Sequence, residues 1–207
     1  MTQTAPRTVE RSTQYMTIED YLIYDDGTEA RYELEDGVLV EMTLESTINS
    51  AIARFLLFEL AKLFPAKLLA YKDTAIQVTG RRARARYPDL LVHSEESYTA
   101  LLSSKQAILL QDMPPPLLVV EVVSPGKTNR DRDYRYKWTE YAARGISEYW
   151  IIDPEAQQIT LCLWVDGQYE NRVYCGSELL QSAAIPAFNL TAAQILTFGE
   201  DQLPLQV

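Results

Sequence analysis

The side chains best suited to chemistry in this 207-residue chain are three acids and a lysine. Glu121 interrupts the apolar run LLVVEVV, Asp89 lies in YPDLLV, and Glu33 lies in the strand-like RYELE. A carboxylate among apolar neighbours is costly to bury unless a cation or a hydrogen-bond network pairs with it. The residue pattern alone therefore predicts a site at Glu121, which a metal ion, a lysine or a polar network would each satisfy.

Together these groups have the parts of a metal-dependent phosphodiesterase. Mg²⁺ is commonly held by one or two carboxylates together with water and substrate phosphate, and such an ion polarises a phosphoryl group and supplies hydroxide. Lys137, beyond the Glu121 strand, would orient the water or stabilise the developing charge. Simpler interpretations stay open for each residue: Asp89 as a turn cap, Glu33 as a solvated hairpin residue, and Lys137 as an exposed partner of Asp133.

A strand–helix–strand unit is expected to position the central acid. The runs LLVVEVV and YWII are nearly continuous apolar, which is typical of strands buried in a sheet with helical cover. The segment between them predicts a helix from about Asp131 to Arg144, with Gly145 as its C-cap.

On that helix, Tyr134, Trp138 and Tyr141 share one face at about 100° per residue. Lys137 borders this face, so its stem can lie along the sheet while its ammonium reaches the carboxylates. Asp133, one turn earlier, is close enough to pair with it.

Turn and capping signals predict the remaining elements. Asp36-Gly37 and Asp166-Gly167 each lie between strand-like runs, which indicates an N-terminal and a C-terminal β-hairpin. The other expected elements are a short helix through Tyr21 capped by Thr17, a helix from Ser46 or Thr47 to about Leu63, a strand over 68–78, a short helix at 98–102 and a closing helix at 191–197. These patterns together predict an α/β protein with strands buried in a sheet under helical cover.

Composition limits the class of protein. Hydrophobic residues make up 47% and charged residues 23% of the chain, an ordinary globular balance. No apolar run approaches the ~20 residues of a membrane span, and the polar N-terminus lacks a signal core, so a cytoplasmic protein is expected. Residues 1–14 are expected to be a disordered tail and 15–207 one domain. Cys162 and Cys175 form no metal motif and are expected to be buried thiols that face each other across the C-terminal hairpin.

The net charge of −10 argues against a broad nucleic-acid surface. Two local basic segments nevertheless interrupt the acidic body. In the first segment, the candidate phosphate contacts are Arg81, Arg82 and Arg84, with Arg86 in the same run. In the second, in or beside the predicted helix, they are Arg130 and Arg132, with Arg135. Solvated helix and loop faces are the alternative interpretation of both segments.

An ordered set of motifs resembles a known family. The set comprises RYELEDG at 31–37, PD at 88–89, EVVSP at 121–125, DYRYK at 133–137, Tyr141, Gly145 and EYWIIDP at 148–154. It resembles the Uma-type restriction endonuclease family of the PD-(D/E)XK nuclease superfamily, over about residues 15–195. PD alone would carry no weight, whereas the full ordered set is specific.

The resemblance implies an α/β, restriction-endonuclease-like fold, with a central mixed sheet flanked by helices, and a Mg²⁺ or Mn²⁺ site. Asp89 and Glu121 would hold the ion together with the backbone carbonyl of Val122, and Glu33 would be an accessory acid. Two departures stand out. The superfamily's in-strand lysine position is Val123 here, so Lys137 on the next helix would supply the lysine. The 47–49 region has no histidine where many relatives carry one.

The expected function is therefore hydrolysis of DNA phosphodiester bonds by a metal-dependent endonuclease. A catalytically inactive module of the same fold, binding nucleic acid or protein, is the alternative from another class. A nuclease acting on RNA or on a branched junction is a third interpretation. A homodimer is expected, because two sites related by a two-fold axis suit double-strand cleavage.

Overall fold

A six-stranded sheet forms the centre of the fold in the computed structural model, which describes residues 15–28, 30–42 and 44–199. Its strand order is β11-β10-β9-β8-β6-β3. The strands are β3 (Leu69–Ala70), β6 (Leu90–Val92), β8 (Leu118–Val122), β9 (Glu148–Asp153), β10 (Gln158–Val165) and β11 (Gln168–Cys175). Only β8 and β9 pair in parallel, and the other neighbours are antiparallel. The predicted mixed sheet is confirmed.

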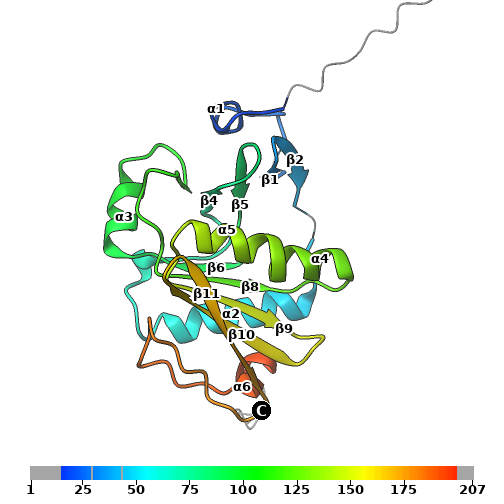
Figure 1. Cartoon of the computed structure of the whole chain (residues 1–207), viewed down its shortest axis with the longest axis vertical. Coiled ribbons are helices and arrows are strands. Elements are labelled where there is room, and N and C mark those ends of the chain that lie inside the picture. Colours follow the sequence, from blue (N-terminus) through cyan, green and yellow to red (C-terminus); the bar gives the residue numbers. More distant parts are fainter. Residues whose placement is uncertain (1–14, 29, 43, 200–207) are drawn as a thin grey trace, which may run out of the picture.

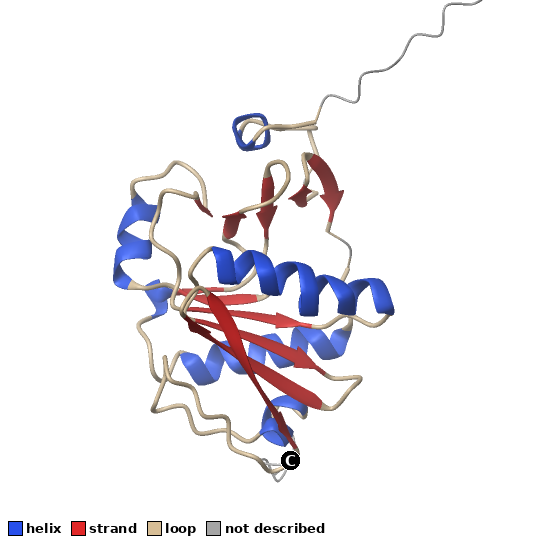
Figure 2. Cartoon of the chain, viewed as in Figure 1, coloured by secondary structure: helices blue, strands red, loops and turns tan. Residues whose placement is uncertain are grey.

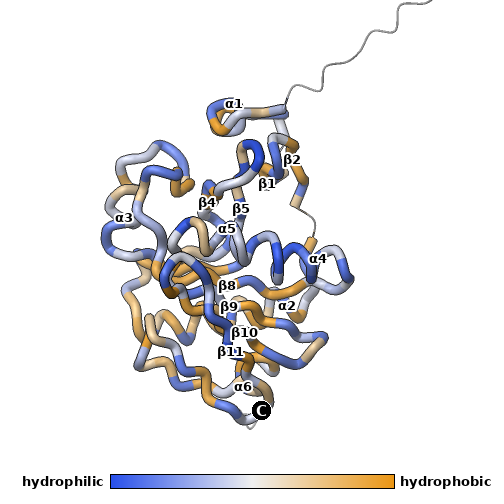
Figure 3. The backbone as a smooth tube through the Cα atoms, viewed as in Figure 1, coloured by the Kyte–Doolittle hydropathy of each residue, from blue (hydrophilic) through white to orange (hydrophobic). Residues whose placement is uncertain are grey.

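Helices cover both faces of this sheet, as the expected buried strands require (Figures 1 and 2). Val120 and Val122 of β8 pack with Ile52 and Leu56 of α2 (Thr47–Leu60), and α6 (Ala192–Leu196) joins that layer. Val119 and Val123 pack on the opposite face with Tyr141 of α5 (Trp138–Ala143). Because side chains alternate along a strand, Glu121 points toward the α5 side. Figure 3 shows the apolar character of β8 and β9 between these helices.

A second, five-stranded sheet was not predicted. Its order is β2-β1-β5-β4-β7, and its strands are β1 (Tyr32–Glu35), β2 (Val38–Glu41), β4 (Ala75–Val78), β5 (Arg84–Arg86) and β7 (Ile108–Leu109). The chain passes between the two sheets at 71–74 and again at 87–89. The single strand predicted over 68–78 is therefore wrong: Lys72 adopts a left-handed conformation, with φ of 53°, and redirects the chain from one sheet to the other.

The helix that follows β8 starts earlier and is less regular than predicted. It comprises α4 (Lys127–Asp131), a π-helical segment η2 (Arg132–Lys137) and α5, and it ends before Gly145 at φ 74°. Asp133, Lys137 and Tyr141 all face the sheet and are buried. In a regular α-helix, side chains four residues apart differ in direction by about 40°. The wider π turn reduces this difference, so that the three side chains face the sheet together.

The short-range turn predictions are otherwise confirmed. Both hairpins form, at Asp36-Gly37 and Asp166-Gly167. The side chains of Thr17 and Ser46 cap α1 (Ile18–Leu22) and α2. The remaining helices are η1 (Ala66–Leu68) and α3 (Glu95–Leu102). None of the helices within the described ranges is long and apolar enough to cross a membrane.

The prediction for the two cysteines is wrong in part. Cys162 lies opposite Asn171, and Cys175 lies opposite Gln158, so the thiols do not face each other. Cys162, in the middle of β10, is buried, and Cys175, at the open end of the hairpin, is exposed. The tail expected at 1–14 lies outside the described residues.

Candidate active site

The predicted acids and lysine meet where the two sheets join. Glu33 comes from β1 of the second sheet, Asp89 from the crossing between β5 and β6, Glu121 from β8 of the central sheet, and Lys137 from η2. All four line one cleft of about 110 Å³. Tyr87, Glu45, Ser124 and Arg132 are among the other residues that line it.

Lys137 is the electrostatic centre of this cleft. Its Nζ lies 2.8 Å from Glu121 Oε1, 3.5 Å from Asp133 Oδ1 and 3.9 Å from Glu33 Oε1. Its side chain is only 3% exposed, so the interpretation as a surface partner of Asp133 is wrong. Burial by itself lowers the pKa of Lys137, but the carboxylates of Glu121, Glu33 and Asp133 outweigh it and raise that pKa.

Glu121 is fixed by a second donor. The hydroxyl of Tyr141 donates to Glu121 Oε1 at 2.8 Å. Burial raises the pKa of Glu121 well above its usual range, and the charges of Asp89 and Asp133 add to this, while Lys137 opposes it. The ammonium of Lys137 therefore does not fully offset the burial of Glu121.

Asp89, directly before β6, links that strand to β8. Its Oδ2 accepts a hydrogen bond of 2.7 Å from the Val122 amide, and its Oδ1 lies 3.5 Å from Lys72 Nζ. Lys72 is shared, because it also pairs with Glu45. Burial raises the pKa of Asp89, and the Val122 amide and Lys72 offset this only in part.

Glu33 differs from the other two acids. The Tyr87 amide donates to its Oε1 at 3.0 Å, and the Arg86 guanidinium donates to its Oε2 at 3.1 Å. Burial alone raises the pKa of Glu33, but Lys137 and Arg86 outweigh it, so that the pKa is lowered. Glu33 is thus an ionised anchor for Lys137 and not a solvated hairpin residue.

The oxygen atoms around Asp89 and Glu121 suit a hard cation. Within the described part of the chain, no three acidic, histidine or cysteine side chains converge into a ready-made metal cage. Mg²⁺ needs only one or two carboxylates when water and substrate complete its ligands. The Val122 carbonyl accepts from Asn49 Nδ2 at 3.2 Å, which leaves one of its two lone pairs for another partner. The carboxylates of Asp89 and Glu121, whose pKa values stay raised, and the Val122 carbonyl therefore fit the implied ion.

An arginine cluster adjoins the cleft and was missed from the sequence. Arg86, only 1% exposed, donates to Glu140 Oε2 at 2.8 Å and reaches both Glu33 and Glu35 at 3.1 Å. Arg84 pairs with Asp36 and with the same Glu140. The spacing of Arg84 and Arg86 could have revealed this cluster, because residues two apart on a strand point to the same face.

The arginines predicted to contact phosphate lie in different surroundings. Arg132 lines the cleft, and its Nε lies 3.4 Å from Asp133 Oδ1. Arg84 is engaged in the arginine cluster, and Arg130 pairs with Asp153 and lies over the Tyr134 ring. Arg82 lies over the ring of Tyr15 with its guanidinium carbon 3.6 Å from the ring centroid, and Arg81 is exposed.

Three further residues shape the site without having been predicted to do so. Asn49 supports the Val122 and Val123 carbonyls, and it falls in the region where the expected histidine is missing. Lys72 reaches Asp89 only because the chain turns between sheets there. Tyr141 was placed on the correct helix face, but its bond to Glu121 had no sequence signal.

The comparisons agree with this architecture. Residues 18–193 match the Uma2 family, described as "Putative restriction endonuclease". The chain belongs to this family, as the motifs indicated. A crystal structure titled as "a putative nuclease belonging to DUF820", from Anabaena variabilis ATCC 29413, is similar to it with a TM-score of 0.66 at 15% identity. That likeness covers 88% of this chain and 98% of the other and shows a shared, restriction-endonuclease-like fold. No curated protein matches this chain.

Proposed function

We propose that this protein is a metal-dependent endonuclease that hydrolyses phosphodiester bonds in DNA with Mg²⁺ or Mn²⁺. The observation that carries the proposal is the buried ammonium of Lys137, 2.8 Å from Glu121, in a cleft where Glu121 and Asp89 remain underneutralised. Membership of the Uma2 family supports the same reaction class.

Each residue of the cleft has a distinct task in this scheme. Asp89, Glu121 and the Val122 carbonyl would hold the ion, which polarises the phosphoryl group and lowers the pKa of bound water. Lys137 holds the attacking water through its ammonium hydrogens and stabilises the charge that develops on the phosphate. Glu33 fixes Lys137 on one side, and Tyr141 fixes Glu121 on the other.

Arg132 is the cleft's candidate phosphate contact. Its side chain is 34% exposed, so it can face a substrate while Asp133 steadies it. A guanidinium suits this task because its planar donors match two phosphate oxygens at once. The overall negative charge of the chain makes such a local cation necessary for substrate approach.

A nuclease screen with Mn²⁺ tests the proposal. The wild-type chain and Glu121→Ala would be incubated with duplex DNA, single-stranded DNA, a branched DNA junction and RNA. We expect Mn²⁺-dependent cleavage of DNA by the wild type only. Cleavage of RNA or of the junction alone would reassign the substrate, and equal activity of the variant would place the reaction outside this cleft.

The second candidate is a catalytically inactive module that binds nucleic acid or protein. Val123 in place of an in-strand lysine favours it. The two candidates separate by metal binding: a catalytic site should bind Mn²⁺ and lose it when Asp89 is replaced, whereas an inactive module should bind nucleic acid without Mn²⁺ dependence.

We also propose a homodimer, since cutting both strands of a duplex is simplest with two sites related by a two-fold axis. Exposed aromatic side chains such as Tyr136, with 52% of its surface accessible, are suited to an interface. Light scattering at micromolar concentration should give twice the mass of the 23.6 kDa chain. A single species of monomer mass would contradict the proposal.

A further inference from the structure

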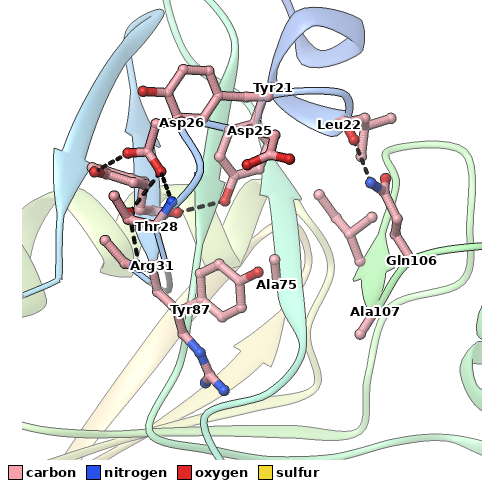
Figure 4. A pocket seen from close by; sticks show the side chains of 14 residues that line it. Tyr21, Leu22, Asp25, Asp26, Thr28, Arg31, Ala75, Tyr87, Gln106 and Ala107 are labelled. Carbon is pink, nitrogen blue, oxygen red and sulfur yellow. Dashed lines mark hydrogen bonds between the residues drawn. The ribbon is translucent and has the colours of Figure 1, made fainter.

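A second and larger cavity, of about 360 Å³, adjoins the cleft. Its walls come from α1 and the loop after it, from β1, and from the starts of β4 and β7 (Figure 4). Because side chains alternate along β1, Tyr32 faces this cavity while Glu33 faces the cleft. A cavity of this size is in the range of small-ligand pockets.

The two cavities share a wall. Tyr87 lines both of them, and its amide donates to Glu33 Oε1. Arg31, on the lining of the larger cavity, donates to the backbone carbonyl of Lys72, whose ammonium lies 3.5 Å from Asp89. A polynucleotide held by a phosphate in the cleft would therefore have the larger cavity on the other side of Tyr87.

The lining suits a flat, uncharged group. Four tyrosines contribute to it, and two of them, Tyr24 and Tyr32, pack edge to face with ring centroids 5.8 Å apart. Aromatic side chains bind nucleobases by stacking. Asp25 and Asp26 also line the cavity and would repel a phosphate entering it, while Arg31 is the one cation of this lining among the described residues.

The two aspartates are not equivalent. Asp26 already accepts from the Tyr32 hydroxyl at 2.6 Å and from the amide and hydroxyl of Thr28. Asp25 accepts only the Gly27 amide, at 2.7 Å, within the described part of the chain. Asp25 thus keeps acceptor capacity for an exocyclic amino group, as carboxylates do toward cytosine N4.

We propose that this pocket receives one unstacked nucleobase of the nucleic-acid substrate, with preference for bases that carry an amino group. Asp25 accepts from the amino group, the tyrosines contact the ring, and the attached phosphate stays outside near Arg31. Bases displaced from the stack are recognised in this way by hydrogen bonds to their edge and by aromatic contacts. The inference rests on the proposed function, since it assumes a nucleic-acid substrate in the neighbouring cleft.

Free nucleosides test the pocket without any cleavage step. Adenosine, cytidine and thymidine would be titrated into the full-length wild-type chain, without metal, and followed by calorimetry and ligand-observed NMR. We expect adenosine and cytidine to bind at least about fivefold more tightly than thymidine, since a single well-placed base contact gives discrimination of this order. Equal binding of all three, or none, would overturn the proposal.

Variants locate the binding. Asp25→Asn should remove the preference over thymidine, and Tyr24→Ala should weaken all three nucleosides, whereas Asp112→Asn, an exposed aspartate on another loop, should change neither. Competition by tetramethylammonium against adenosine would identify a cation pocket and overturn the base assignment. Nucleoside binding in a chain that cleaves nothing would support the pocket while the nuclease function fails. Cleavage without nucleoside binding would refute the pocket alone.

Discussion

Two buried charge clusters meet at Glu33 and differ in how their acids are neutralised. In the arginine cluster, formed by Arg84, Arg86, Asp36, Glu35 and Glu140, guanidinium groups donate directly to each carboxylate. The Arg84 hydrogen bond is the largest of the effects that lower the pKa of Asp36. Each acid of the arginine cluster is therefore paired with a cation of the chain itself.

In the cleft cluster, formed by Asp89, Glu121, Asp133 and Lys137, the cations of the chain do not fully offset the burial of the acids. Lys137 is shared by Glu121 and Asp133, Lys72 is shared by Asp89 and Glu45, and burial still raises the pKa values of Asp89 and Glu121. Buried carboxylates whose pKa stays raised beside these lysines are suited to a divalent ion supplied from outside. The comparison therefore distinguishes a charge network that is paired within the chain from the candidate metal site, although both include residues of the helix that follows β8.

Replacing Arg86 should have the largest effect, and on stability. Arg86→Met removes the buried cation that Glu33 and Glu140 share, and breaking a buried ion pair from one side costs about 3–5 kcal/mol. Denaturant unfolding would measure the loss. Arg81→Met, at an exposed position, should change the free energy of unfolding by less than about 0.5 kcal/mol. Similar values for both variants would contradict a structural role for the arginine cluster.

Replacing Lys137 should slow the reaction, and it should also lower stability, because it removes a buried cation from Glu121 and Asp133. Lys137→Ala should slow Mn²⁺-dependent cleavage by about 10²-fold or more. Mn²⁺ binding should be no weaker than in wild type, because the variant keeps the carboxylates and loses a competing cation beside Glu121. Lys137→Arg should restore only part of the rate, because a planar guanidinium presents a different geometry from a compact ammonium. Cleavage rates and calorimetry on the same samples check both statements. An unchanged rate in Lys137→Ala, with a loss in Lys127→Ala, would transfer the role to Lys127.

The smallest expected effect is a pH-dependent gain in stability. Because the pKa of Asp89 is raised in the folded state, its ionised form opposes folding of the metal-free protein at pH 7.5, and that burden shrinks as the pH falls and Asp89 takes up a proton. Metal-free Asp89→Asn should therefore melt a few degrees above wild type at pH 7.5, since ~1 kcal/mol shifts Tm by about 2–4 °C in a domain of this size. The difference should shrink as the pH falls toward the ordinary pKa of an aspartate, about 3.9.

Glu33→Gln supplies the opposite sign as a control. The pKa of Glu33 is lowered in the folded state, so its ionised form stabilises the protein above the ordinary glutamate pKa, and this contribution is lost as the pH falls further. Thermal melts should show Glu33→Gln below wild type at neutral pH. A lower Tm for Asp89→Asn at pH 7.5 would show that Asp89 is neutralised within the chain, as the arginine-cluster acids are.

The features predictable from the sequence were those that local signals determine. The apolar runs around Glu121, the Asp-Gly turns and the helix caps depend on neighbouring residues, and they gave the central sheet, both hairpins and the position of Lys137 on its helix. Lys72 and Arg86 required knowledge of which strands lie side by side. The run at 68–78 reads as one strand, and only tertiary packing shows that it divides between two sheets at Lys72.

Calorimetric titration of Mn²⁺ tests the central claim, that the cleft cluster needs an external cation and the arginine cluster does not. Wild type, Asp89→Asn and Glu121→Gln would be compared with Glu35→Gln, which changes a partly exposed acid of the arginine cluster. We predict that wild type and Glu35→Gln bind Mn²⁺ alike and that Asp89→Asn and Glu121→Gln lose the binding. Equal Mn²⁺ binding by all four proteins would contradict the account.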